Sequence, residues 1–194
     1  MATPVRLLFF AGSSRTGSFN KQLARLGSMI AEANGIPSTF ADLGDYPMPI
    51  YNADLEAAEG QPENAHKFKE LMAAHSGIFI ASPEYNASIT PLLKNTIDWI
   101  SRVRERGEPP LAVFKDRAFA LGGASDSAYG AVRSLMALRQ VLELGCGALV
   151  IPEQVTVFRA SEAFDEMDNL TEERTANALK RVLQRLIDSA RAMA

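Results

Sequence analysis

The sequence predicts a single α/β domain in which helices cover both faces of a five-stranded parallel sheet. Short apolar runs alternate along the chain with longer amphipathic stretches, which is the pattern of successive β–α units. The length of 194 residues suits one domain, and the chain contains no internal repeat or linker-like segment. Its hydrophobic fraction of 47% and charged fraction of 22% are those of an ordinary globular protein. We therefore expect residues 1–194 to form one three-layer α/β/α domain.

The first element is a strand at residues 5–11, where apolar side chains follow one another as they do in strands buried on both faces. This run is too short to be the apolar core of a signal peptide. A helix is predicted over residues 19–33, because its apolar residues recur on one face at helical spacing. Asn34 and Gly35 end this helix, and a short second strand is expected at residues 37–42.

The next segment is a loop of roughly fifteen to twenty residues, and loops this long in compact domains are usually functional or contact a partner. The remaining elements continue the alternation: a helix at residues 63–74, a strand at 77–82, a helix with Pro91 in its first turn, a strand at 118–122, a helix at 130–144, a strand at 148–158 and a last helix from Thr171. The pattern thus predicts five strands and five helices, but not the order of the strands.

The charge of the chain disfavours two classes of partner. A formal net charge of −3 lacks the basic footprint of a nucleic-acid-binding protein, and no polybasic segment points to a lipid surface. We therefore expect neither nucleic acid nor membrane as a partner. The single cysteine, Cys146, cannot form an intramolecular disulfide, which fits a cytoplasmic protein. No neighbouring histidine or basic residue lowers its pKa, so we expect a packed side chain and no catalytic thiol.

Several polar residues are predicted to have structural roles. His66 and His75 are both assigned to the helix that begins at residue 63, without a cluster of cysteines or acidic residues around them. We expect both at the helix surface and predict no metal site. Lys94, Asn95 and Asp98 are expected to brace the helix that carries Pro91 in its first turn.

Ligands of open α/β sheets bind beyond the carboxyl ends of the strands, so the loops after the first, third and fourth strands are the places to search. The first loop, residues 12–20, combines glycines, hydroxyls and Arg15 just before a helix. Glycines let backbone N–H groups turn toward an anion, and the helix start adds partial positive charge. A bound phosphate explains this composition, and a serine-capped turn with a solvated arginine is the alternative.

Two other phosphate-binding motifs are absent from this loop. The P-loop pattern G-x-x-x-x-G-K-[ST] requires a lysine after Gly17, where Ser18 stands. The dinucleotide fingerprint G-x-G-x-x-G requires a second glycine soon after Gly12, where Ser13 and Ser14 stand. The sequence therefore disfavours a kinase, a GTPase and a simple Rossmann dehydrogenase.

The other two loops are ambiguous when each is taken alone. Residues 82–86 offer a stiff proline and the flat ring of Tyr85, which can pack against a planar ligand or cover the core. Residues 122–130 are small and rich in hydroxyls, which suits the close approach of a flat ligand or a flexible connector. All three loops are expected on one edge of the sheet, and together they favour a ligand site there.

The same loops carry a resemblance to a known family. Residues 12–20, Gly-Ser-Ser-Arg-Thr-Gly-Ser-Phe-Asn, resemble the G-S-x-R-x-x-S-x-N phosphate loop of the NADPH-dependent FMN reductase family. Residues 82–86 and 93–99 are similar to that family's S-P-E-Y-N…L-K-N-x-x-D-W segment. Residues 124–142 are similar to its third loop and following helix, including a Leu-Arg pair. The resemblance covers about residues 5–158.

This resemblance implies a flavodoxin-like fold with strand order 2-1-3-4-5 and FMN at the switch point between the first and third strands. The residues that match the family's motifs would bind FMN: Ser13, Arg15, Ser18 and Asn20 at its phosphate, Pro83, Glu84, Tyr85 and Asn86 along its isoalloxazine ring, and Ser125 from the third loop. One departure is Asp126, which adds a negative charge where family members often carry Ser-Pro-Gly.

The resemblance also implies an NAD(P)H-dependent FMN oxidoreductase. NADPH or NADH would pass a hydride to bound FMN, which then reduces an acceptor such as a quinone, free flavin, chromate or an azo compound. Because a flavin carries this chemistry itself, no catalytic side chain is assigned. The resemblance also implies a homodimer or homotetramer, with Met48 and Tyr51 of the long loop facing a partner subunit. The alternatives are a non-enzymatic electron carrier of the same fold and a sensor that uses the flavin only as a redox switch.

Overall fold

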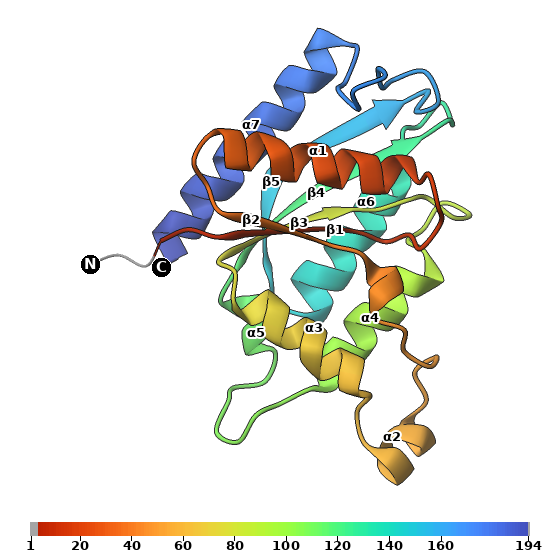
Figure 1. Cartoon of the computed structure of the whole chain (residues 1–194). Helices are drawn as coiled ribbons and strands as arrows, with labels where there is room; N and C mark the ends of the chain where they lie inside the picture. The colour runs from red at the N-terminus through yellow and green to blue at the C-terminus, as the bar shows by residue number, and fades with distance from the viewer. Residues whose placement is uncertain (1–3, 194) are drawn as a thin grey trace.

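A five-stranded parallel sheet forms the centre of the computed structural model, which describes residues 4–193 (Figure 1). The strands are arranged in the order β2-β1-β3-β4-β5. Their bounds are Leu7–Ala11 for β1, Ser38–Ala41 for β2, Gly77–Ala81 for β3, Ala118–Ser125 for β4 and Leu149–Phe158 for β5. This order confirms the predicted flavodoxin-like topology. The order in which the chain adds strands reverses between β1 and β3, which are neighbours in the sheet. In such sheets ligands bind beyond the carboxyl ends of the strands at this point.

The helices form two layers, one on each face of the sheet (Figure 1). The first layer consists of α1 (Phe19–Ala33) and α7 (Glu173–Met193), and the second contains α3 (Glu63–Ala73), α4 (Pro91–Arg102), α5 (Ala112–Lys115) and α6 (Val132–Arg139). Successive side chains of a strand point to opposite faces. Leu7 and Phe9 of β1 therefore pack under the first layer, while Leu8 and Phe10 pack under the second.

The prediction of five helices was wrong, because the structure contains two further short ones within residues 4–193. The helix α2 (Ala53–Glu59) lies inside the long loop that follows a 3₁₀ turn, η1 (Leu43–Asp45), and it has no buried residue. A helix without an apolar face produces no periodic signal in the sequence. The other addition, α5, is a single turn that Leu111 opens in the left-handed conformation. The predicted fourth helix also continues beyond α6 as a π-helical segment, η2 (Gln140–Gly145).

Hydrogen bonds from two side chains of α4 hold the loop between η1 and α3 against that helix. Trp99 donates from Nε1 to the Pro49 carbonyl over 2.7 Å, and Asn95 donates from Nδ2 to the same oxygen over 2.9 Å. The Asn95 carbonyl also accepts the Tyr51 backbone N–H at 2.7 Å. This confirms a structural role for Asn95. Lys94 and Asp98, expected to share it, form an ion pair of 2.7 Å on the same helix.

The two apolar side chains assigned to a partner contact pack inside this chain. Met48 and Tyr51 are half-buried against Trp99, and the Tyr51 and Trp99 rings meet edge to face with centroids 5.0 Å apart. Their neighbour Ile50 is instead 84% exposed. The apolar group that this loop presents outward is therefore Ile50.

The prediction that His75 lies at a helix surface was wrong. It follows the end of α3 and is only 3% exposed. Its Nδ1 lies 2.7 Å from the Leu71 carbonyl and its Nε2 lies 2.9 Å from the Thr39 hydroxyl of β2. Burial lowers the pKa of His75. His66 stays half-exposed on α3, as expected.

The Leu138-Arg139 pair joins α6 to an irregularity in β5. The register between β4 and β5 shifts between Phe119 and Leu121, so β5 bulges there. Arg139 donates from Nη2 to the carbonyls of Ile151, at 2.7 Å, and Pro152, at 3.0 Å. These bonds satisfy backbone acceptors that the bulge removes from the ladder.

Candidate functional site

The three loops predicted to form a site meet around one cleft of about 250 Å³ at the carboxyl edge of the sheet. The first loop contributes Ser13, Arg15, Ser18 and Asn20, the second Pro83, Glu84 and Tyr85, and the third Ser125. Phe19, Ala124 and Asp126 complete its lining. The structure therefore brings together every predicted binding residue except Asn86.

The first loop is shaped to receive an anion at the start of α1. Ser18 caps this helix and accepts the Lys21 backbone N–H at 3.5 Å. The Ser13 oxygen accepts the Arg15 N–H at 3.2 Å, which leaves its own O–H able to donate. Gly17 adopts a φ of 65°, a left-handed conformation that glycine tolerates best. Hydroxyls, backbone N–H groups and the positive end of a helix thus converge on the cleft.

Arg15 supplies the full positive charge at this end of the cleft. Its guanidinium lies 5.5 Å from the centroid of the Phe19 ring and makes only a 3.5 Å contact with the Thr16 carbonyl. No carboxylate lies within ion-pair distance of it among residues 4–193. The guanidinium is exposed, and its donors can reach a phosphate in bidentate geometry.

Asn20 holds two of the loops together. Its side chain is buried, its Nδ2 donates to the Ala124 carbonyl over 2.8 Å, and its Oδ1 accepts the Ala124 N–H over 3.0 Å. Both polar atoms of the amide are therefore engaged by the end of β4. Asn20 therefore positions the first loop against the third.

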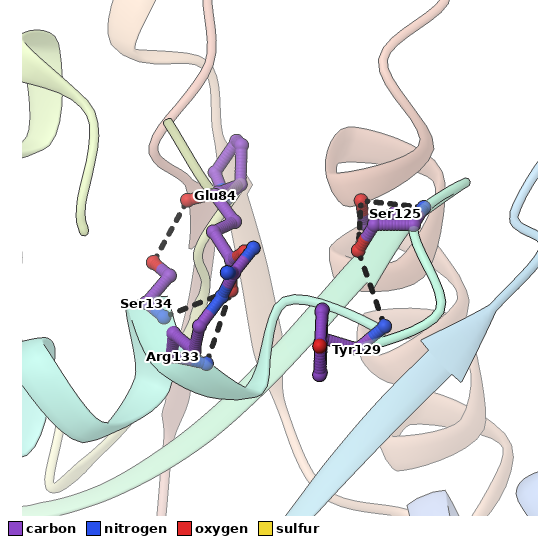
Figure 2. A network of polar contacts seen from close by, with 7 residues as sticks. Glu84, Ser125, Tyr129, Arg133 and Ser134 are labelled. Carbon is purple, nitrogen blue, oxygen red and sulfur yellow. Dashed lines mark hydrogen bonds and ion pairs between the residues drawn. The ribbon is translucent and has the colours of Figure 1, made fainter. Parts of the chain in front are cut away.

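The Glu84 carboxylate contacts Arg133 and Ser134 at the start of α6 (Figure 2). It accepts the backbone N–H groups of Arg133 at 3.0 Å and Ser134 at 3.3 Å, and the Arg133 guanidinium at 2.7 Å through Nε. The Glu84 side chain is 4% exposed and that of Arg133 is 43% exposed. Burial alone raises the pKa of Glu84, but these donors outweigh it and hold the pKa below its ordinary value.

A second set of hydrogen bonds fixes the proline beside Glu84. The Ser134 hydroxyl donates to the Pro83 carbonyl over 2.8 Å and lies 2.6 Å from the Ser82 hydroxyl. All of these oxygens are buried. The start of α6 therefore sets the position of the second loop. Sequence analysis missed Arg133 and Ser134, because 49 and 51 residues separate them from Glu84 and Pro83 and no local spacing marks the contacts.

The second loop ends in a tight turn that presents the Tyr85 ring. Tyr85 and Ser88 exchange two backbone hydrogen bonds of 3.0 Å. Between them Asn86 and Ala87 have φ values of 50° and 65°, as in a type I′ turn. The Tyr85 ring is 55% exposed at the cleft, whereas Asn86 lies at the exposed tip of the turn.

The third loop is held by its own side chains. Ser125 accepts the Ser127 N–H at 3.1 Å, and Ser127 in turn accepts the Tyr129 N–H at 3.3 Å (Figure 2). Asp126, the departure from the family pattern, accepts the Ser161 N–H at 2.7 Å. Its carboxylate therefore ties the third loop to the segment after β5, on the rim of the cleft.

The residues present fit FMN. One end of the cleft offers hydroxyls, a free guanidinium and a helix start, which suit a phosphate; the other offers Pro83, the Tyr85 ring and Ser125, which suit a planar ring system. Within residues 4–193, no group of three or more histidine, cysteine or acidic side chains is placed to hold a metal ion. No helix in that part of the chain is long and apolar enough to cross a bilayer.

Comparison with known proteins identifies the family of the chain. Residues 5–162 match the family model described as NADPH-dependent FMN reductase. An NAD(P)H-dependent FMN reductase of Pseudomonas aeruginosa is 34% identical over 96% of this chain and 95% of its own length. A quinone reductase of Escherichia coli is 35% identical over 73% of this chain and 71% of its own length.

A solved structure shows the same architecture. The NAD(P)H:acceptor oxidoreductase FerB of Paracoccus denitrificans, a flavoenzyme, superimposes with a TM-score of 0.79 at 26% identity and covers 97% of this chain and 98% of its own. These matches confirm the predicted class of oxidoreductase and its FMN cofactor. The chain belongs to the NADPH-dependent FMN reductase family.

Proposed function

We propose that this protein uses NAD(P)H to reduce bound FMN and passes the electrons to a quinone. The observation that carries the choice of acceptor is Tyr85, which lines the FMN cleft and is 55% exposed. An exposed aromatic face in a cleft favours a flat, uncharged molecule over a compact oxyanion such as chromate. The quinone reductases among the relatives support the same class of acceptor.

In this proposal the protein binds and orients FMN and the two substrates, and FMN, when bound, would supply the hydride chemistry. Ser13, Arg15 and Ser18 bind the phosphate, and Pro83 and Tyr85 flank the ring. The hydrogen bonds from α6 to Glu84 and Pro83 keep this part of the cleft in place before the cofactor binds. Such preorganisation strengthens FMN binding, because less conformational entropy of the loop is lost when the cofactor binds.

We also propose a homodimer in the cytoplasm. The outward-facing Ile50, on the loop that is fastened to α4, supports an apolar contact with a second copy there. Light scattering during size-exclusion chromatography tests this. The homodimer should become a monomer when Ile50 is replaced by aspartate, and an unchanged dimer places the interface elsewhere.

Acceptor competition under anaerobic conditions tests the choice of quinone. The FMN-loaded protein is supplied with NADPH and, in separate assays, with 1,4-benzoquinone, free FMN, chromate and an azo dye. The proposal predicts that kcat/KM is highest for the quinone and that one quinone is consumed per NADPH. The Tyr85→Ala variant should lose activity toward the quinone more than toward chromate. A preference for free FMN or chromate contradicts the proposal.

A further inference from the structure

A second cleft, of about 440 Å³, lies directly beside the FMN cleft. It is bounded by the start of α1, by Asp42 at the end of β2 and by Asp168 in the loop before α7. Arg15 and Ser18 line both clefts, so the two are separated only by these side chains. Its volume is in the range of sites for small organic ligands, about 300–1,000 Å³, and exceeds what an inorganic anion needs.

The charges in this cleft favour an anion. Three cationic side chains, Arg15, Lys21 and Arg25, line it together with Asp42 and Asp168. Lys21 is neutralised by Asp42, which it contacts over 2.6 Å. Neither Arg15 nor Arg25 has a carboxylate within ion-pair distance in the part of the chain that the structure describes. Arg15 also lines the FMN cleft, whereas Arg25 lines this cleft alone, so the Arg25 guanidinium is the one available to a second ligand.

The walls of the cleft are held in place without a ligand. The Arg25 guanidinium lies 4.0 Å from the centroid of the Phe40 ring of β2, a cation–π contact that limits its freedom. Gln22 donates to Asp168 over 2.5 Å and so links α1 to the loop before α7, which lies above the start of α1 in Figure 1. Asp42 also accepts the Gly44 N–H at 2.9 Å. An arginine held flat against a ring is suited to bind a phosphate or to stack on a base.

We propose that this cleft receives the adenosine end of the reduced nicotinamide dinucleotide, and that Arg25 binds its 2′-phosphate and makes NADPH the favoured donor. The position next to the FMN cleft allows one dinucleotide to reach from this cleft to the flavin. Arg15 is occupied by the FMN phosphate in the loaded protein, so Arg25 is the cation that remains for a second phosphate. The inference rests on the FMN-loaded state of the proposed function, but not on the acceptor.

Isothermal titration calorimetry on the FMN-loaded protein tests the inference. The probes are adenosine nucleotides that carry no nicotinamide, so no electron transfer occurs and no electron acceptor is needed. Adenosine 2′,5′-bisphosphate should bind more tightly than adenosine 5′-monophosphate, and salt should weaken its binding. The Arg25→Ala variant should raise the Kd for the bisphosphate about tenfold, which corresponds to one charge-assisted hydrogen bond. The Asp168→Asn variant should lower this Kd, because it removes a negative charge from the same cleft.

A kinetic comparison adds a second readout. The Arg25→Ala variant should raise the KM for NADPH about tenfold more than the KM for NADH. The matched control is Arg185→Ala on the outer face of α7, which removes the same charge from an arginine that lies outside the cleft. It should leave the ratio of the two KM values unchanged.

Three results would overturn the inference. Equal affinity for the two adenosine nucleotides removes the basis for a 2′-phosphate site. An Arg25→Ala variant with unaltered affinity shows that this side chain does not bind the phosphate. Displacement of FMN by the bisphosphate shows that the second cleft belongs to the flavin phosphate site. The quinone proposal survives each of these results, because none of the binding assays contains an acceptor.

Discussion

Replacing Glu84 by alanine removes the carboxylate that joins the second loop of the FMN cleft to α6. Two backbone N–H groups, of Arg133 and Ser134, then lose their acceptor. Because water reaches the exposed side of this contact, each loss costs about 1 kcal/mol, the lower end of the usual range. The Arg133 side chain is 43% exposed, so the ion pair adds no more than about 1 kcal/mol. The free energy of unfolding should fall by about 2–3 kcal/mol.

Urea unfolding of the FMN-free protein measures this loss directly. A change of about 2–3 kcal/mol corresponds to a decrease in Tm of roughly 5–10 °C for a domain of this size. The Glu84→Gln variant retains an acceptor for the backbone N–H groups and should lose only about 1 kcal/mol. Glu70→Ala, an exposed glutamate on α3, is the matched control and should change stability by less than about 0.5 kcal/mol.

Acid pH and FMN binding provide two further tests of Glu84. The folded-state pKa of Glu84 is lowered, so its stabilisation is present above the unfolded value of 4.5 and is lost as the pH falls through the folded value. The stability difference between the wild type and Glu84→Gln should therefore disappear at low pH. FMN affinity of Glu84→Ala should fall by about twofold to tenfold, because the loop must be ordered on binding. If Glu84→Ala is no less stable than Glu70→Ala, the α6 anchor does not hold the site.

Three other predictions follow from buried polar groups. The Asn20→Ala variant leaves the Ala124 N–H and carbonyl without their side-chain partners, so its free energy of unfolding in urea should fall by about 2 kcal/mol. The Asn20→Asp variant removes only the bond that Asn20 donates. If that variant is as stable as wild type, the donated bond does not stabilise the fold. Burial raises the pKa of Cys146 to about 11, so a disulfide reagent at pH 8 should label it only after unfolding, and rapid labelling of the folded protein contradicts its packing. The folded-state pKa of His75 is lowered by burial, so the free energy of unfolding should decrease as the pH falls below about 6.5. In the His75→Gln variant the free energy of unfolding should depend less on pH in this range. An unchanged slope would contradict the assignment of this dependence to His75.

The sheet was predictable from sequence because its central strands carry continuous apolar runs. Residues 7–11 and 77–81 are buried throughout, and residues 118–124 of β4 are buried as well, as in strands covered on both faces. The strand order and the FMN loops came from the family resemblance, since pattern alone left the topology open. The helix α2 was not predictable, because it buries no residue and is held by the Asn52 cap and by contacts of Glu56 with Tyr51 and with the distant Arg102.

The roles of individual site residues depend on contacts between distant segments. The Asn20 amide bonds to a residue 104 positions away, so its position in a phosphate-loop motif could not reveal that both of its polar atoms are engaged. The burial of His75 depends on Thr39, 36 positions earlier. Residues that lie in the local loop, such as Arg15 and Ser18, were expected at the cleft from sequence and do line it. Residues whose role is set by packing between elements were not found from sequence.

The central claim is that this chain binds FMN in the cleft formed by its three loops and reduces it with NAD(P)H. Anaerobic stopped-flow mixing of the FMN-loaded protein with NADPH tests this claim most directly. The account predicts that the visible flavin absorbance bleaches before any acceptor is added and returns when a quinone follows. It also predicts that Arg15→Ala weakens FMN binding at least tenfold, through loss of charge-assisted hydrogen bonds to the phosphate. A flavin that stays oxidised in excess NADPH, or FMN affinity that is unaffected by Arg15→Ala, would contradict it.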